Sequence, residues 1–186
     1  MNMFCFQCQE TARGTGCTVK GVCGKDPQTA AYMDVLLYAV RGIAIVNRTL
    51  REKGTADNEI DHFVLDALFC TITNANFDDE AIIVRIKKAF EIKNILVGTA
   101  KKRNIALPDM PEVAYFVSEE NYIAEAAEVG VLSEPNEDLR SLKQMVIYGV
   151  KGAAAYTEHA LNLGFEDHDI YAMIENALAE ISRSDI

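Results

Sequence analysis

Apolar residues recur at helical spacing through most of this chain. Beyond residue 27 they return every three or four positions, which places them on one face of an α-helix. The first stretch begins at Asp26-Pro27, where proline fits the first turn, and carries Leu36, Val40 and Ile43. No segment of convincing length alternates apolar and polar residues as a β-strand does. The pattern predicts an all-α fold.

Capping residues and helix breakers divide this pattern into six helices. Asp57 and Asp167 each precede an apolar stretch and can cap it, and Ser118 can do the same for a short helix ending at Gly130. Pro108 and Pro111 interrupt the pattern, so we expect an irregular connector around them. The expected helices span roughly 28–54, 57–73, 78–102, 118–130, 135–164 and 167–181.

Part of the helical sequence is repeated. Residues 34–69 align with residues 144–179 at a constant offset of 110 without a gap, and nine of the 36 positions are identical. Both copies read as a long helix, a glycine stop, an aspartate cap and a second helix. Gly42 and Gly152 also match, in mid-helix, where glycine costs up to about 1 kcal/mol relative to alanine. Close approach of another helix would explain both glycines.

The charge of the chain restricts its partners. It has 18 Lys and Arg against 28 Asp and Glu, a net charge of −10. Nucleic acids and anionic membrane surfaces both bind basic patches, so we expect neither as a partner. The best apolar stretch, from Met33 to Val46, contains Asp34 and Arg41 and is too short for a bilayer. Because the first residues do not resemble a signal peptide, we expect a cytoplasmic protein.

Four of the five cysteines are concentrated at the N-terminus. Cys5, Cys8, Cys17 and Cys23 have the spacing C-x2-C-x8-C-x5-C, and only Cys70 lies elsewhere. A disulfide framework would distribute its cysteines over a small secreted domain. Thiols gathered at one end of a chain indicate a metal site instead.

The identity of the metal stays open at this point. Thiolates suit zinc and iron–sulfur clusters, but structural zinc sites usually pair two C-x2-4-C knuckles and this motif has only one. A cluster is wider than a single ion and can be held by loops of unequal length. The cysteine spacing therefore leaves three possibilities open: a 4Fe–4S cluster, a structural zinc ion or unligated redox thiols. Four glycines are expected to let the loop fold tightly, namely Gly14, Gly16, Gly21 and Gly24. The apolar residues Phe4, Phe6 and Val22 are expected to shield a cluster from water. The cations Arg13, Lys20 and Lys25 could offset its negative charge.

The cysteine segments also resemble a known family. Phe4–Thr11 and Gly16–Lys25 are closely similar to the opening of the hybrid-cluster proteins, which are also called hydroxylamine reductases or prismane proteins. The segments Leu68–Asp78 and Tyr148–Tyr156 are similar as well, and the resemblance extends over essentially the whole chain.

The resemblance implies a helical first domain that carries a cubane. In this family the N-terminal cysteines bind an Fe–S cluster, so Cys5, Cys8, Cys17 and Cys23 correspond to its ligands. Their short spacing resembles the 4Fe–4S subgroup rather than the 2Fe–2S subgroup. The family's first domain consists of two three-helix bundles in a fold related to carbon monoxide dehydrogenase. We therefore expect a cluster-binding loop at 1–27, a first bundle at 28–106 and a second at 107–186.

The chain departs from the family in length. Members have two further α/β domains, whose His, Glu and Cys residues bind the hybrid Fe–S–O cluster where hydroxylamine or nitric oxide is reduced. No cysteine follows Cys70 here, so that hybrid cluster is not expected in this chain. We expect an electron-relay domain whose partners are the missing C-terminal domains and a redox donor protein.

The parent protein would reduce hydroxylamine to ammonia and water. Whether this chain alone is an enzyme is left open, with inactivity expected and no catalytic residue assigned. The alternative is a zinc-stabilised helical interaction domain without a redox role.

Cysteine and histidine residues outside the motif have simpler interpretations. Cys70 lies on an apolar helix beside Phe69, where a buried thiol behaves as a small hydrophobic side chain. His62, His159 and His168 are scattered without ligand spacing and are expected at the surface or at helix caps.

Overall fold

The computed structural model describes residues 3–55, 57–73 and 75–183. These residues form seven α-helices and three short 3-10 helices, and their only β-type pairing is the isolated bridge between Cys5 and Cys17. The predicted all-α class is confirmed. The α-helices are α1 (Pro27–Arg51), α2 (Asn58–Ile72), α3 (Asp79–Lys102), α4 (Pro111–Ala114), α5 (Tyr122–Val129), α6 (Glu137–Asn162) and α7 (His168–Glu180).

Three predicted helix starts are confirmed by their hydrogen bonds. The side chain of Asp26 accepts from a backbone amide at the start of α1. Asp57 accepts from the amide of Glu59 at 3.0 Å, and Asp167 accepts from the amide of Asp169 at 3.0 Å. Each cap satisfies an amide that has no partner within its helix.

Other boundaries differ from the prediction. The connector contains a short helix, α4, because Pro111 occupies its first turn, where a missing N–H costs nothing. Ser118 precedes a 3-10 turn and makes no side-chain cap there, so α5 begins only at Tyr122. The cap of α6 is Asn136, whose side chain accepts from the amide of Leu139.

The internal repeat extends to backbone geometry. Gly54 and Gly164 both have positive φ, at 76° and 83°, and each follows a long helix. In both copies the amide after the glycine donates to the carbonyl five residues earlier, at 3.0 Å. The caps Asp57 and Asp167 then begin the second helix of each pair with the same extended conformation. The pairs α1–α2 and α6–α7 are therefore structural copies.

The two repeated mid-helix glycines differ in their surroundings. A Cβ at Gly42 would lie 2.3 Å from the carbonyl oxygen of Glu112, so the predicted close approach is confirmed there, with α4 as the neighbour. A Cβ at Gly152 would meet nothing within 4 Å. The prediction of a close approach at Gly152 is wrong for the described residues.

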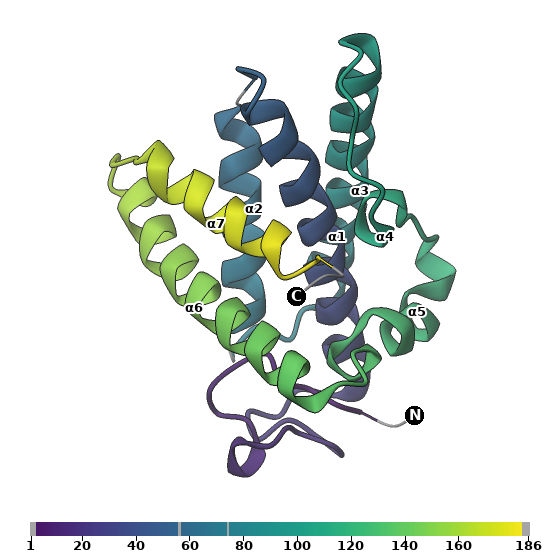
Figure 1. The fold of residues 1–186 in the computed structure, drawn as a ribbon. Coiled ribbons are helices and arrows are strands. Elements are labelled where there is room, and N and C mark those ends of the chain that lie inside the picture. The colour runs from purple at the N-terminus through teal and green to yellow at the C-terminus, as the bar shows by residue number, and fades with distance from the viewer. Residues whose placement is uncertain (1–2, 56, 74, 184–186) are drawn as a thin grey trace.

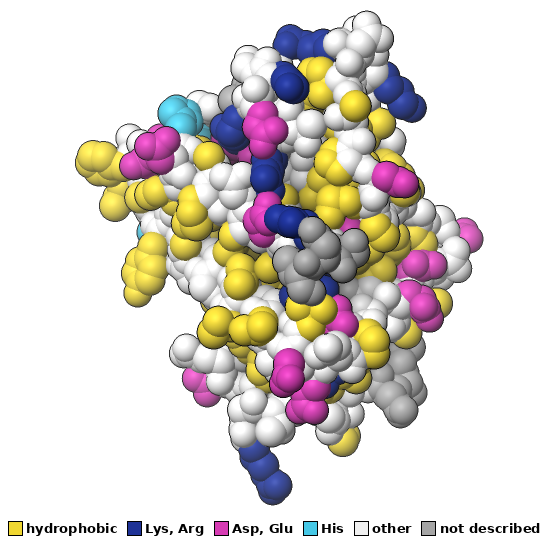
Figure 2. Space-filling view, in the orientation of Figure 1, with side chains coloured by type: hydrophobic (Ala, Val, Ile, Leu, Met, Phe, Trp, Pro, Cys, Tyr) yellow, Lys and Arg dark blue, Asp and Glu magenta, His cyan; other side chains and the backbone are white. Residues whose placement is uncertain are grey.

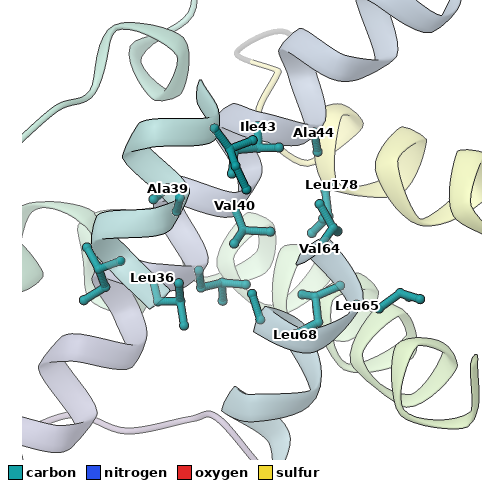
Figure 3. Close-up of a cluster of buried hydrophobic side chains, with 14 of the residues drawn as sticks. Leu36, Ala39, Val40, Ile43, Ala44, Val64, Leu65, Leu68 and Leu178 are labelled. Atoms are coloured by element: carbon teal, nitrogen blue, oxygen red, sulfur yellow. The ribbon is translucent and has the colours of Figure 1, made fainter. Parts of the chain in front are cut away.

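The two helix pairs pack across each other. Helix α1 contacts α7, and α2 contacts α6, while α3, α4 and α5 cover the rest of α1 (Figure 1). One continuous core results, in which Val40 of α1 meets Val64 and Leu68 of α2 and Leu178 of α7 (Figure 3). Contacts thus cross the predicted boundary between 28–106 and 107–186, and this division into two bundles stays a prediction.

Helix α1 is the centre of the core. By length and composition it could cross a membrane, since an 18-residue window has a mean hydropathy of 1.5. However, 83% of that window is buried inside the protein. Its apolar side chains are already covered by the surrounding helices, as expected for the central helix of a bundle.

A buried ionic network joins the two helix pairs. The guanidinium of Arg51 on α1 binds Asp61 of α2 at 2.5 Å and Glu175 of α7 at 3.0 Å. Asn47 donates to Glu175 as well. One cation therefore serves two carboxylates, and burial raises the pKa of Glu175 to about 7. At neutral pH this carboxylate is held near the point where it takes up a proton.

We expect Glu175→Gln to remove a pH-dependent loss of stability. Because the folded-state pKa of Glu175 lies above its unfolded value of 4.5, its contribution is fully present below pH 4.5 and is lost as pH rises through 7. The loss amounts to about 3 kcal/mol. Because burial also raises the pKa of Asp34 to about 7, both proteins should lose stability in this range, but urea unfolding at a series of pH values should show a decline that is about 3 kcal/mol smaller in the variant than in the wild type.

Glu180→Gln is the matched control. Glu180 lies on the same helix and pairs with Arg48, but its side chain is exposed. This variant should keep the wild-type decline between pH 4.5 and 7. An equal decline in Glu175→Gln would contradict the assignment.

Candidate metal centre

Backbone pairing brings two of the four predicted ligands together. The N-terminal loop, residues 3–25, lies beneath one end of the helices (Figure 1). Within it Cys5 and Cys17 exchange two backbone hydrogen bonds of 2.9 Å as an antiparallel pair. Residues directly opposite in such a pair project their side chains to the same face. The two thiols therefore lie side by side.

The sulfur of Cys17 is surrounded by hydrogen-bond donors. It accepts from the amide of Ala12 at 3.4 Å and lies 3.8 Å from the hydroxyl oxygen of Thr11. Burial disfavours the thiolate, but the backbone of Ala12 and of Val22 and the Thr11 hydroxyl outweigh it and lower the pKa of Cys17. This environment stabilises a negatively charged sulfur, the form that binds metals.

The other three thiols lie in different settings. Burial raises the pKa of Cys5. Cys8 is half-buried, and its carbonyl accepts a hydrogen bond of 2.8 Å from the hydroxyl of Tyr148 on α6. Cys23 lies in a tight turn closed by the amide of Gly24, which donates to Gly21 at 2.8 Å. All five cysteines of the chain are free thiols.

The donor set fits an iron–sulfur cluster by its chemistry. Four thiols in one loop, with backbone amides directed at sulfur, are the usual surroundings of such clusters. Among the described residues, no three His, Cys, Asp or Glu side chains converge closely enough to hold a single ion. Thiolates that bind different irons of one cluster stand farther apart than the ligands of one ion. Among the residues that the structure describes, the backbone brings Cys5 and Cys17 together, whereas Cys8 and Cys23 lie in the same loop without a recorded contact to another thiol.

The predicted shielding residues have mixed outcomes. Phe4 packs directly on Gly16, where a Cβ would lie 2.6 Å from the ring, and Phe6 meets Tyr148 at 5.4 Å between ring centroids. Val22 is 64% exposed, so the prediction that it shields the site is wrong. The glycine turn around Cys23 directs the side chain of Val22 to solvent.

Only one of the three predicted cations lies inside the site. Arg13 and Lys20 are exposed, whereas Lys25 is buried and its ammonium lies 2.8 Å from the sulfur of Met33. The positive charge of Lys25 favours the thiolate form of both sulfurs: it adds to the hydrogen bonds that lower the pKa of Cys17 and partly opposes the burial that raises the pKa of Cys5. It is the loop cation that can offset thiolate charge.

A second buried cation comes from outside the loop, and the sequence analysis missed it. The side chain of Lys151 on α6 is 1% exposed and donates to both the backbone oxygen and the side-chain oxygen of Gln7. Gln7 in turn donates to Asp34 on α1. Burial lowers the pKa of Lys151 to about 8 and raises that of Asp34 to about 7. This chain of contacts fixes the loop to both long helices.

The sequence contains a signal for this contact. Lys151 shares a helix face with Ile147 and Ala154, which are both buried. A lysine on an apolar face requires a polar partner inside the protein. Its repeat counterpart, Arg41, is likewise directed inward and binds Glu112. The periodicity therefore marks Lys151 as buried, although it does not name Gln7 as its partner.

The residues expected to lie apart from the site do so. Cys70 is 6% exposed and accepts from the side chain of Asn76 at 3.0 Å, and burial raises its pKa. The three histidines contact side chains outside the N-terminal loop, namely Glu166 for His62, Phe69 for His159 and Tyr171 for His168.

We expect Lys151→Met to loosen the N-terminal loop. The variant leaves Asp34 and Gln7 without their buried cation, which costs about 3 kcal/mol of unfolding free energy. Urea unfolding measures that loss, and limited proteolysis should show faster cleavage before residue 26. Lys143→Met, also on α6, breaks a partly exposed pair with Glu134 and should cost less than about 1 kcal/mol. Equal effects of the two variants would contradict the role of Lys151.

The chain matches known proteins over its full length. It matches the family described as Prismane/CO dehydrogenase over residues 3–186. A hydroxylamine reductase from Bacteroides thetaiotaomicron is 54% identical over 186 residues, which is 100% of this chain and 34% of that protein. A hydroxylamine reductase from Desulfitobacterium hafniense strain Y51 is 46% identical over 182 residues, which is 96% of this chain and 33% of that protein.

These relatives are about three times as long as the matched region. The chain spans about a third of each of them. Since the family match covers nearly every residue, the chain belongs to the Prismane/CO dehydrogenase family.

Proposed function

We propose that this chain is the electron-relay domain of a longer protein that reduces hydroxylamine. In this proposal Cys5, Cys8, Cys17 and Cys23 hold one 4Fe–4S cluster. The environment of Cys17 carries the proposal, because a buried sulfur that accepts from an amide and lies beside a hydroxyl is prepared to bear negative charge. The hydroxylamine reductases among its relatives support the same activity for the whole protein.

The residues of the chain have separate roles in this proposal. When bound, the cluster takes up and releases single electrons at a potential set by charge, hydrogen bonds and solvent exposure. The amide of Ala12 and the hydroxyl of Thr11 stabilise the Cys17 thiolate. Lys25 and Lys151 place two buried positive charges close to the four thiolates and so favour the more negative, reduced state.

The proposal assigns the reaction itself to the rest of the protein. Reducing hydroxylamine to ammonia and water breaks an N–O bond and consumes two electrons and two protons. These electrons would come from a redox donor protein in the cytoplasm, a reducing compartment in which thiols stay free to bind metal. Nitric oxide is a second substrate of the same class.

Metal and sulfide analysis tests the proposal directly. Anaerobically purified protein should be brown, absorb broadly near 400 nm and contain roughly four irons and four acid-labile sulfides per chain. A colourless protein with one zinc would refute the relay and support the zinc-stabilised interaction domain.

We expect Cys8→Ser and Cys17→Ser to lose the cluster but to keep most of the helices. The helices bury their own apolar faces in one core, so their formation does not depend on the N-terminal loop. Iron content should fall several-fold, while far-ultraviolet circular dichroism changes little. Cys70→Ser is the matched control, because Cys70 is a buried thiol outside the loop, and this variant should retain its iron. Complete unfolding of the loop variants would show that the cluster holds the fold together.

We also expect that this 186-residue chain does not reduce hydroxylamine when loaded with iron and sulfide. Binding a substrate nitrogen requires an iron with an open coordination position, and four cysteines leave none open on a cubane. The only other thiol, Cys70, is buried and hydrogen-bonded to Asn76. An anaerobic assay with reduced viologen should give no ammonia above cluster-free controls. Ammonia well above those controls would contradict the relay role.

A further inference from the structure

The ammonium of Lys25 is buried without an acidic partner. The residue is 2% exposed, and among the described residues its ammonium donates to one acceptor, the sulfur of Met33, at 2.8 Å. Of the ion pairs that the described residues form, none includes Lys25. A thioether is a weak acceptor, so this contact does not replace the hydration that the ammonium loses on burial. The positive charge of Lys25 therefore needs an anion from elsewhere in the site.

The other lysines near the thiols are better satisfied. Lys20 is exposed, and Figure 2 shows a cationic side chain that protrudes into solvent at the end of the molecule where the loop lies. Lys151 is buried like Lys25, but it has two oxygen acceptors on Gln7. Within the described part of this site, Lys25 is thus the buried lysine that has no oxygen partner.

The turn that carries Cys23 holds Lys25 in this position. The amide of Gly21 donates to the carbonyl oxygen of Lys25 at 2.7 Å. A Cβ at Gly21 would lie 3.0 Å from the Cβ of Lys25 and 3.1 Å from the sulfur of Cys23, so a larger residue would crowd both side chains. From this turn the side chain of Lys25 reaches Met33, which is fully buried on α1. Closing the loop against α1 therefore also buries the ammonium.

The groups around this ammonium are mostly thiols. Its charge favours the ionised form of four neighbouring groups, namely Asp34, Cys5, Cys17 and Cys70. Asp34 is the only carboxyl group among these four, and it also faces the ammonium of Lys151. One carboxylate thus serves two buried ammonium groups. While the thiols are neutral, this part of the protein has an excess of positive charge, and thiolates would remove it.

We propose that Lys25 couples closure of the N-terminal loop to loading of its metal site. The inference rests on the proposed function, in which the four loop cysteines bind a cluster as thiolates. A cluster held by four thiolates carries a net negative charge, so in the loaded protein the ammonium of Lys25 has its anion. In the metal-free protein the same ammonium is buried at a cost, and the loop opens to hydrate it. The open loop leaves the thiols accessible until metal is bound.

Lys25→Met tests this coupling, because methionine keeps the length of the side chain and removes its charge. In the closed loop the amides of Cys5 and Cys17 donate to each other's carbonyl oxygens at 2.9 Å, so their hydrogen exchange reports closure. In the metal-free protein the variant should slow this exchange by about ten-fold, because no charge has to be buried. In the protein loaded with iron and sulfide, the variant should lose iron to a chelator about ten-fold faster than the wild type, because the buried counter-charge is missing.

Two other lysine variants are the controls. Lys20→Met removes an exposed charge from the same loop and should change neither the exchange nor the loss of iron. Lys151→Met removes a buried ammonium that has oxygen partners. It should therefore speed the exchange in the metal-free protein, which is the opposite of the effect expected for Lys25→Met.

A second substitution separates charge from packing. Lys25→Leu also removes the charge but has a different shape, and it should change the exchange and the loss of iron in the same directions as Lys25→Met. Effects confined to one of the two variants would overturn the proposal, because charge would then not be their cause.

Two further results would overturn the proposal. One is equal or faster exchange in the metal-free Lys25→Met protein, and the other is unchanged loss of iron from the loaded variant. The exchange measurement on the metal-free protein requires no cluster. Failure of the wild type to bind iron would refute the proposed function, and the exchange rates would still decide whether Lys25 opposes closure of the metal-free loop.

Discussion

The buried ammonium of Lys151 is the constraint on which the position of the N-terminal cysteine loop depends. An ammonium with no solvent contact must find oxygen partners inside the protein, or the fold loses several kcal/mol. Its partners are the backbone and side chain of Gln7, in the middle of the cysteine motif, and Gln7 also reaches Asp34. Directional polar contacts therefore fix the loop beside a small apolar cluster in which Met3, Cys5 and Cys17 pack with Ala30 of α1. The loop lies where α1 and α6 can both hold it.

The repeat explains why these side chains are available. Tyr38 and Tyr148 are counterparts, as are Arg41 and Lys151, and in both copies this pair holds a segment that lies outside the long helices. On α1 the pair holds the segment around α4, through the ring of Tyr115 and the carboxylate of Glu112. On α6 the pair holds the N-terminal loop through Cys8 and Gln7. Equivalent surfaces of α1 and α6 thus hold two unrelated segments, and of these two only the N-terminal loop carries thiols.

Local signals gave the correct fold class and most of the helices, because caps and apolar periodicity depend on neighbouring residues. Asp57 and Asp167 begin their helices as predicted, and Gly54 and Gly164 end the preceding ones. The errors concern long-range packing. Nothing near Val22 shows that it points to solvent, and nothing near Gly152 shows that its neighbour is absent. The spacing of the four cysteines predicts a metal site, whereas Tyr148 and Lys151 become part of it only through contacts more than a hundred residues apart.

The helical core and the N-terminal loop are likewise two separate parts of the molecule. The helices meet in one core that includes no residue of the N-terminal loop, whose buried residues form a separate small cluster with Ala30. The loop is nevertheless attached to α6 through Tyr148 and Lys151, and a hollow of about 660 Å³ beside it is lined by Cys8, Tyr148 and Gly152. Because solvent exposure is one of the factors that set the potential of an iron–sulfur cluster, the openness of this hollow would influence the potential of the cluster proposed for the loop.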